Sequence, residues 1–212
     1  FWRGWFYTTD HVDIGIADFD HDGLLDLAVL SGNEVEKVGH VTLLRNTGEG
    51  YGDGYGEPFV PNGVFDAGHT PVELAIGDVN DDFVSDIVTA DGGDAGQGIA
   101  PHVGVLRGIR PLHNGFGHVL GDPLSFAVLD APIATASADI DFDGHLDLLS
   151  LHATGSEGLL AVSLNDGDGN FTYTASYAVN AGATDLAVGD VNGDALADVV
   201  VVGEPGDGGE HL

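Results

Sequence analysis

The chain has 212 residues, of which 35 are Asp or Glu and 5 are Lys or Arg, so its formal net charge at pH 7 is −30. So negative a chain excludes nucleic acid as an expected partner, and its self-repulsion favours bound cations. Cysteine is absent, which excludes disulfides and thiol chemistry, and no apolar run reaches the length of about 18 residues that a membrane span needs.

Four similar acidic segments follow one another along the chain, each of the form Asp-x-Asp/Asn-x-Asp-x-x-x-Asp. They begin at Asp18, Asp78, Asp139 and Asp190, which are 60, 61 and 51 residues apart. A period of this length suits the four-stranded blade of a β-propeller. The repeat is therefore the organising feature of the sequence.

Short apolar runs lie at the same places around each acidic segment, and they predict strands. A first run enters the segment and a second leaves it, a third follows, and a Gly-rich turn leads to a fourth run that contains an aromatic residue. The first runs are 12–17, 72–77, 133–138 and 184–189, and the second are 27–30, 87–90, 148–151 and 199–202. The third are 41–44, 103–106 and 159–164, and the fourth are 58–65, 124–129 and 171–178.

These runs predict an all-β fold, a β-propeller of four-stranded blades. The repeats fall at approximately 10–65, 66–129, 130–180 and 181–212, with the last one partial, and Trp5–Thr9 takes the place of a fourth strand of a preceding blade. A propeller must close its ring or leave open sheet edges. We therefore expect more chain, or a second copy, to complete a larger ring. The N-terminus has neither a starting Met nor a signal-peptide pattern, so we interpret the chain as processed or cut from something longer.

Each acidic segment supplies oxygen ligands at alternate positions, as calcium requires. Positions 1, 3, 5 and 9 provide side chains and position 7 a backbone carbonyl. The predicted ligands of the first two loops are Asp18, Asp20, Asp22, Leu24, Asp26 and Asp78, Asn80, Asp82, Val84, Asp86. Those of the third and fourth loops are Asp139, Asp141, Asp143, His145, Asp147 and Asp190, Asn192, Asp194, Leu196, Asp198.

Position 6 should rank the four calcium sites, because the sharp turn there favours a positive φ that glycine adopts freely. Gly23 and Gly144 fit this position, whereas Phe83 and Ala195 do not. We expect up to four calcium ions, with the loops at Asp18 and Asp139 the strongest and the loop at Asp78 the weakest.

EF-hand loops, dockerin loops and metal-free turns are also rich in Asp and Asn. An EF-hand or a dockerin loop needs an acidic residue at position 12 and a flanking helix, but position 12 is Val29, Thr89, Ser150 or Val201. Metal-free Asp/Asn/Gly turns remain the structural alternative. Four loops in register favour calcium over them.

The sequence resembles the FG-GAP or VCBS repeats of integrin α-chain propellers and of many secreted bacterial proteins. The resemblance covers nearly the whole chain and rests on Gly189–Asp194, Ala181–Ala183, Asp130–Pro132 and Leu164–Phe171. It implies a propeller, commonly seven-bladed, with calcium in the loop that joins the first two strands of a blade. This chain holds about half that number of blades.

Calcium in these loops would be structural and would suit an extracellular protein, because extracellular calcium modules bind with dissociation constants of about 10⁻⁴ to 10⁻³ M. The leading hypothesis is a secreted or cell-surface module for adhesion or recognition, with a protein or carbohydrate ligand. A propeller domain of a secreted polysaccharide lyase or hydrolase, and a structural subunit of a surface assembly or filament, are the alternatives. The insertions at 50–56, 91–101 and 107–121 are candidate ligand-binding loops.

The sequence favours a non-enzymatic protein without deciding the question. His113 with His118, or His145 with His152, could form pairs, but the ten histidines share no motif. Ser156 lacks the glycine that a nucleophile elbow places two residues before the serine. We therefore name no catalytic residue.

Overall fold

The structure, a computed structural model, describes residues 11–33, 38–49, 57–109, 120–154 and 157–203. The predicted strand Trp5–Thr9, the insertion 50–56 and residues His113, His118 and Ser156 lie outside these ranges. The described residues form strands and loops without a helix, and accordingly they hold no helix long and apolar enough to cross a membrane.

Fourteen strands are present in the described part of the chain, and each overlaps one of the predicted runs. They build three four-stranded antiparallel sheets and one two-stranded sheet. The first sheet is β1 (His11–Ala17), β2 (Asp26–Asn33), β3 (Val38–Asn46) and β4 (Phe59–Asp66). The second is β5 (Pro71–Gly77), β6 (Asp86–Asp91), β7 (His102–Leu106) and β8 (Leu124–Ala127). The third is β9 (Pro132–Ala138), β10 (Asp147–Thr154), β11 (Glu157–Asn165) and β12 (Phe171–Val179), and the last pair is β13 (Ala183–Gly189) and β14 (Asp198–Gly203).

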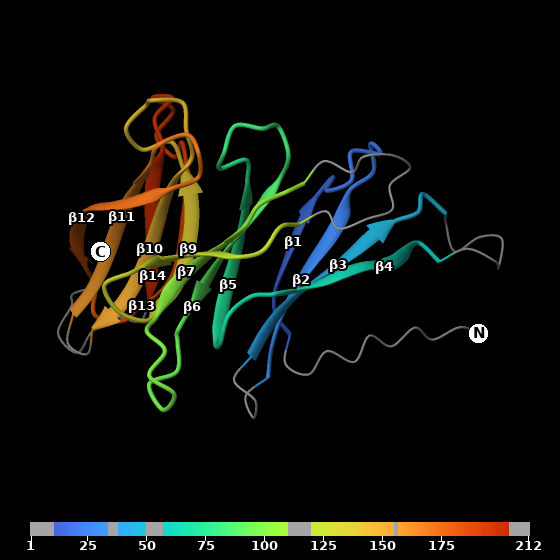
Figure 1. The fold of residues 1–212 in the computed structure, drawn as a ribbon. Helices are drawn as coiled ribbons and strands as arrows, with labels where there is room; N and C mark the ends of the chain where they lie inside the picture. The colour runs from blue at the N-terminus through green and yellow to red at the C-terminus, as the bar shows by residue number, and fades with distance from the viewer. Residues whose placement is uncertain (1–10, 34–37, 50–56, 110–119, 155–156, 204–212) are drawn as a thin grey trace.

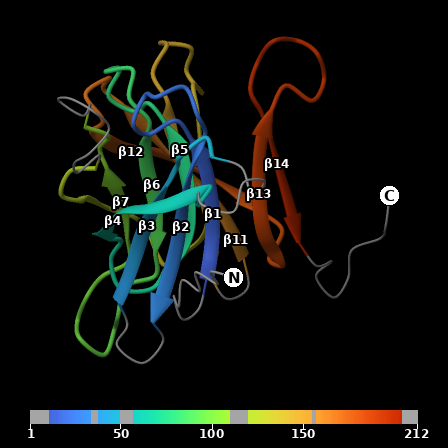
Figure 2. The same cartoon turned by 90° about the vertical axis from the view of Figure 1, so that its right-hand side faces the viewer.

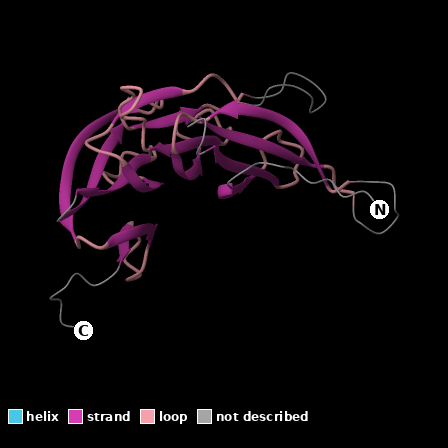
Figure 3. Ribbon diagram, turned by 90° about the horizontal axis from the view of Figure 1, so that it is seen from below, coloured by secondary structure: helices cyan, strands magenta, loops and turns pink. Residues whose placement is uncertain are grey.

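Strand order within each sheet follows the chain, as it does in a propeller blade. The three four-stranded sheets follow one another across Figure 1, from β1–β4 on the right to β9–β12 on the left, and the two-stranded β13–β14 sheet continues the series (Figure 2). Seen from below, the strands follow an arc whose ends do not meet (Figure 3). The all-β fold with four-stranded sheets is thus confirmed, and the sheets form an open arc.

The core lies between neighbouring sheets. One cluster joins the first two sheets and contains Phe19, Leu30, Leu43, Ile87 and Leu106, each at most 1% exposed. Close approach of the sheets requires a small residue at Gly15, where an added Cβ would lie 2.3 Å from the Cδ1 of Ile76. This packing fixes the spacing of the sheets.

Two further clusters continue the core along the arc. Between the second and third sheets, the rings of Phe126 and Phe171 meet edge to face with centroids 5.3 Å apart, a favourable aromatic geometry. The third cluster joins β9–β11 to β13–β14 through Leu149, Leu151 and Leu186. Successive sheets are therefore held together by apolar packing.

Candidate metal centre

The four acidic segments form the loops that join the first and second strands of each sheet. In all four loops the backbone has a positive φ at positions 4 and 6. Position 6 has φ values of 89°, 64°, 95° and 66° at Gly23, Phe83, Gly144 and Ala195. The sequence predicted this left-handed turn at position 6. Because Phe83 and Ala195 adopt it too, the same backbone forms with and without glycine.

Position 4 also adopts a left-handed backbone, which the sequence pattern did not indicate. His21, Asp81, Phe142 and Gly193 have φ values of 58°, 55°, 67° and 84°. His and Asp tolerate this conformation better than most residues, whereas Phe142 is unusual there. The varied residue types at this position explain why it left no clear signal in the sequence.

Side chains within each loop accept hydrogen bonds from the loop's own backbone. In the first loop, Asp18 Oδ1 and Oδ2 accept the N–H groups of Asp22 and Gly23 at 3.1 and 2.9 Å, and Asp22 Oδ1 accepts the N–H of Leu24 at 2.9 Å. Equivalent bonds to positions 1 and 5 recur in the other loops. These bonds turn the acidic side chains toward the inside of the loop.

In the first three loops the aspartate at position 9 is a buried clamp. Asp26, Asp86 and Asp147 are at most 1% exposed, and one oxygen of each accepts the N–H of the residue at position 2. The other oxygen accepts an N–H from the end of the third strand or just beyond it, at Asn46, Gly108 or Asn165. Asp198 makes the first of these bonds, with Val191. In the first three loops, position 9 therefore ties the loop to the third strand of the sheet or to the residues just beyond it.

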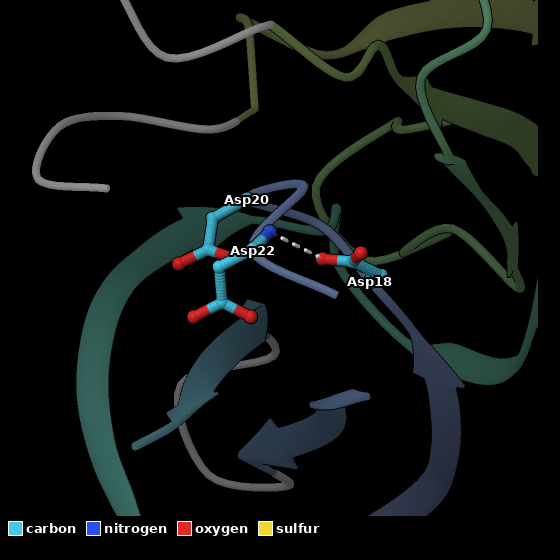
Figure 4. Close-up of side chains that lie close together, drawn as sticks. All are labelled: Asp18, Asp20 and Asp22. Atoms are coloured by element: carbon cyan, nitrogen blue, oxygen red, sulfur yellow. Dashed lines mark hydrogen bonds between the residues drawn. The ribbon is translucent and has the colours of Figure 1, made fainter. Parts of the chain in front are cut away.

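Three carboxylates meet in the first loop, those of Asp18, Asp20 and Asp22 (Figure 4), with one oxygen from each lying within 4.8 Å of the others. Asp26 is not part of this group. A cation already contacts two of its members, because Arg45 Nε lies 2.6 Å from Asp20 Oδ2 and its Nη2 lies 3.1 Å from Asp22 Oδ2.

A second group of three forms in the third loop from Asp139, Asp141 and Asp147, also within 4.8 Å. Here position 9 takes part and Asp143 does not. Asp139 Oδ1 is buried and has no hydrogen-bond partner among the described residues. A buried carboxylate oxygen without a donor is costly, so this oxygen is suited to a cation.

The second and fourth loops have an amide at position 3, Asn80 or Asn192. In the part of the chain that the structure describes, neither loop brings three carboxylates together. Asn80 Nδ2 donates to Asp82 Oδ2 at 3.1 Å, and Asn192 Nδ2 to Asp198 Oδ1 at 3.3 Å. The amides thus bond to carboxylates that the sequence predicts as ligands.

Burial and mutual repulsion raise the pKa of several loop carboxyls. Burial is the main cause at Asp86, whose pKa rises to about 6 although Gly108 and Val79 donate to it. Burial also raises the pKa of Asp26 and Asp141, with further contributions from neighbouring aspartates. Ionised carboxylates at such positions favour a nearby cation.

The residues present fit calcium. The donors are all oxygens, and two ligands of one calcium ion at 2.3–2.6 Å can be at most about 5 Å apart, which the 4.8 Å limit in both groups satisfies. The orphaned oxygen of Asp139 supplies an independent sign at the third loop. Positions 1, 3 and 5 of the first loop and 1, 3 and 9 of the third would hold the ion.

The histidine candidates have separate partners. His145 Nδ1 bonds to Asp81 of the preceding loop, and this contact raises the pKa of His145. His152 is fully buried, with Nε2 2.8 Å from Ser150 Oγ and Nδ1 2.9 Å from the carbonyl of Asp130. These partners give both residues roles in joining loops.

Of the candidate ligand-binding insertions, residues 91–101 are described in full and form a closed turn. Asp94 and Ile99 pair there, and the N–H groups of Gly96 and Gln97 bond to Asp94. In the third insertion, Arg107 donates to the carbonyl of Asp168 in the next sheet, and Arg110 lies outside the described residues. These contacts position the insertions on the sheets.

Comparison with known proteins gave one family. Residues 139–201 match the FG-GAP-like repeat family, and no curated protein matches the chain. The matched segment begins at the first ligand of the third loop and runs through the fourth loop into β14, so it contains the carboxylate group with the orphaned oxygen. Residues 139–201 of the chain therefore carry an FG-GAP-like repeat.

Proposed function

We propose that this chain is an extracellular calcium-binding β-propeller module for adhesion or recognition of a protein or a carbohydrate. The family match and the series of four-stranded sheets support a propeller-type recognition module. Calcium, adhesion and the extracellular location are the further steps of the proposal.

The third loop carries the proposal for calcium. Three carboxylates converge there, and Asp139 Oδ1 is buried without a donor in the described structure. A bound cation would offset the repulsion between these groups and hold the β9–β10 hairpin in place. The role of calcium in this proposal is to stabilise the fold, and recognition belongs to the surface.

Recognition is supported by aromatic side chains that the fold leaves exposed. Phe83 is 82% exposed and Phe142 is 59% exposed, both on acidic loops, and Tyr173 and Tyr177 are exposed on the edge strand β12. Exposed aromatic rings can stack on sugars or bury against a protein partner. An adhesion or recognition role uses such rings.

A melting experiment tests the proposal. The protein is freed of metal with chelator and its melting temperature is measured with and without added calcium, with magnesium as a comparison ion. A ligand that binds only the folded state raises the melting temperature. We expect calcium to raise it by several degrees, and Asp141→Asn to reduce this rise.

Asp122→Asn is the matched control, because Asp122 is an exposed carboxylate outside the loops. It should keep the full response to calcium. An unchanged melting temperature of the parent protein with calcium would defeat the calcium proposal.

A further inference from the structure

The first and third loops differ in a residue outside the loops. Arg45, near the end of β3, contacts Asp20 and Asp22, two of the three carboxylates that meet in the first loop. Asp20 is fully buried at its side chain, and the Arg45 side chain is 23% exposed. The charged pair is therefore largely withdrawn from water.

The equivalent residue in the third repeat is Leu164. The register follows from the clamp at position 9, because Asn46 donates its N–H to Asp26 and Asn165 donates its N–H to Asp147. Arg45 and Leu164 each precede these asparagines. Leucine provides no charge, and no arginine or lysine pairs with the third loop in the described structure.

The second repeat shows that an arginine at this place does not by itself reach the loop. Arg107 precedes Gly108, which donates its N–H to Asp86 of the second loop. Its guanidinium donates to the carbonyl of Asp168 in the third repeat. The contact between arginine and loop carboxylates is thus specific to the first repeat among the described loops.

A cationic side chain that reaches the loop carboxylates lowers the repulsion between them when calcium is absent, and it also lowers the calcium affinity of the loop. The guanidinium offsets the repulsion among the carboxylates, and it occupies Oδ2 of both Asp20 and Asp22. A calcium ion at this loop meets a less negative site with fewer free oxygens. At the third loop, the orphaned Asp139 Oδ1 has no such substitute.

We propose that Arg45 is a built-in counter-cation that keeps the first loop folded without calcium and lowers its calcium affinity below that of the third loop. Leu164 leaves the third loop dependent on the ion. The inference rests on the proposed function in that both loops must bind calcium. It reverses part of the expectation from glycine at position 6, which ranks these two loops together.

Reciprocal substitutions test the proposal in the whole chain. Arg45→Leu and Leu164→Arg exchange the two residues, and Arg45→Gln removes the charge while keeping a long polar side chain. Calcium titration calorimetry measures the affinities, and Asp18→Asn and Asp139→Asn assign the heat to the first or third loop. Melting in chelator measures how far each empty loop supports the fold.

We expect Arg45→Leu and Arg45→Gln to tighten calcium binding at the first loop on the order of tenfold and to lower the melting temperature in chelator. Leu164→Arg should weaken binding at the third loop. Calcium affinities at the first loop that stay within about twofold, or fall, in both Arg45 variants would overturn the inference while the proposed function stands. Absence of calcium binding by the parent protein would overturn both.

Discussion

Glu73 in β5 accepts a hydrogen bond from the backbone N–H of Thr135 in β9, which links the first strands of two successive sheets. The preceding sheet pair has the same link, because Asp13 Oδ2 in β1 accepts the N–H of Leu74 in β5 at 3.1 Å. In β9 the residue equivalent to Asp13 and Glu73 is Ala134, which has no carboxylate. The N–H of Leu186 in β13 bonds instead to the side chain of Asp185 beside it. The carboxylates of Asp13 and Glu73 therefore join the first sheet to the second and the second sheet to the third.

Glu73 should make stability depend on pH near neutrality. Burial raises its pKa from 4.5 to about 7, assisted by the charges of Asp185 and Asp13. Between these values the folded protein keeps a proton that the unfolded chain has released, so stability falls as pH rises through this window. Above about pH 7 the full cost of the charge is present.

Glu73→Gln should remove this slope while keeping a carbonyl acceptor for Thr135. At about pH 8 we expect a gain of about 1–2 kcal/mol in the free energy of unfolding. This is less than the free energy that corresponds to the full pKa shift, because the side chain is only half-buried and water screens its charge. Urea unfolding across the pH range measures it, with Asp122→Asn as the charge-matched control. A parallel pH profile for Glu73→Gln and the parent would contradict the assignment.

Asp86 should stabilise the folded protein as a double acceptor. It is fully buried, and its two oxygens accept the N–H groups of Val79 and Gly108 at 2.8 and 2.6 Å. Asparagine has one acceptor oxygen, so Asp86→Asn would place an amide donor against one of these N–H groups. We expect a loss of about 1–3 kcal/mol in denaturant unfolding, both with calcium and in chelator.

The comparison for Asp86 is Asp82→Asn in the same loop, because Asp82 is exposed and its N–H partner is local. Asp82→Asn should cost less in chelator. Equal losses for the two variants in chelator would show that the clamp at position 9 is not the stronger contact.

His152 should stay neutral in the folded protein. It is fully buried between Ser150 Oγ and the carbonyl of Asp130, and burial lowers its pKa. The unfolded chain takes up a proton as pH falls through the ordinary value of 6.5, and the folded chain does so only at lower pH. Stability therefore falls as pH decreases below that value.

His152→Leu removes this contribution and leaves two polar partners without a bond. We expect a loss of about 1–3 kcal/mol near pH 8 and a shallower fall in stability on acidification, both measured by urea unfolding. His102→Leu is the control, because His102 is partly exposed on the neighbouring sheet. A variant as acid-sensitive as the parent would exclude His152 as the titrating group.

The strands and acidic loops could be predicted because their signals are local and repeated. Position 6 is an example, since Gly23 and Gly144 mark a turn that Phe83 and Ala195 also adopt. The contact of Arg45 with Asp20 could not be predicted, because it joins residues 25 positions apart and the aligned residues Arg107 and Leu164 do not repeat it. The second hydrogen bond of Asp26 likewise could not be predicted, because its donor is the N–H of Asn46, which is distant in the sequence.

Phe83 should be replaceable by glycine with a gain in stability. Its φ is 64° and its side chain is 82% exposed, so it bears a left-handed backbone and buries little apolar surface. The free energy gained by relieving this strain should exceed the cost of the extra conformational entropy that glycine gives the unfolded chain. We therefore expect Phe83→Gly to raise the free energy of unfolding by about 0.5–1 kcal/mol.

Gly144→Ala is the mirror test at the same position of the third loop. Its φ is 95° and an added Cβ would meet nothing within 4 Å, so the backbone alone is strained and we expect a loss of about 1 kcal/mol. Both variants are measured by urea unfolding with calcium and in chelator. A loss of stability in Phe83→Gly would mean that its ring makes a contact worth more than the strain it imposes.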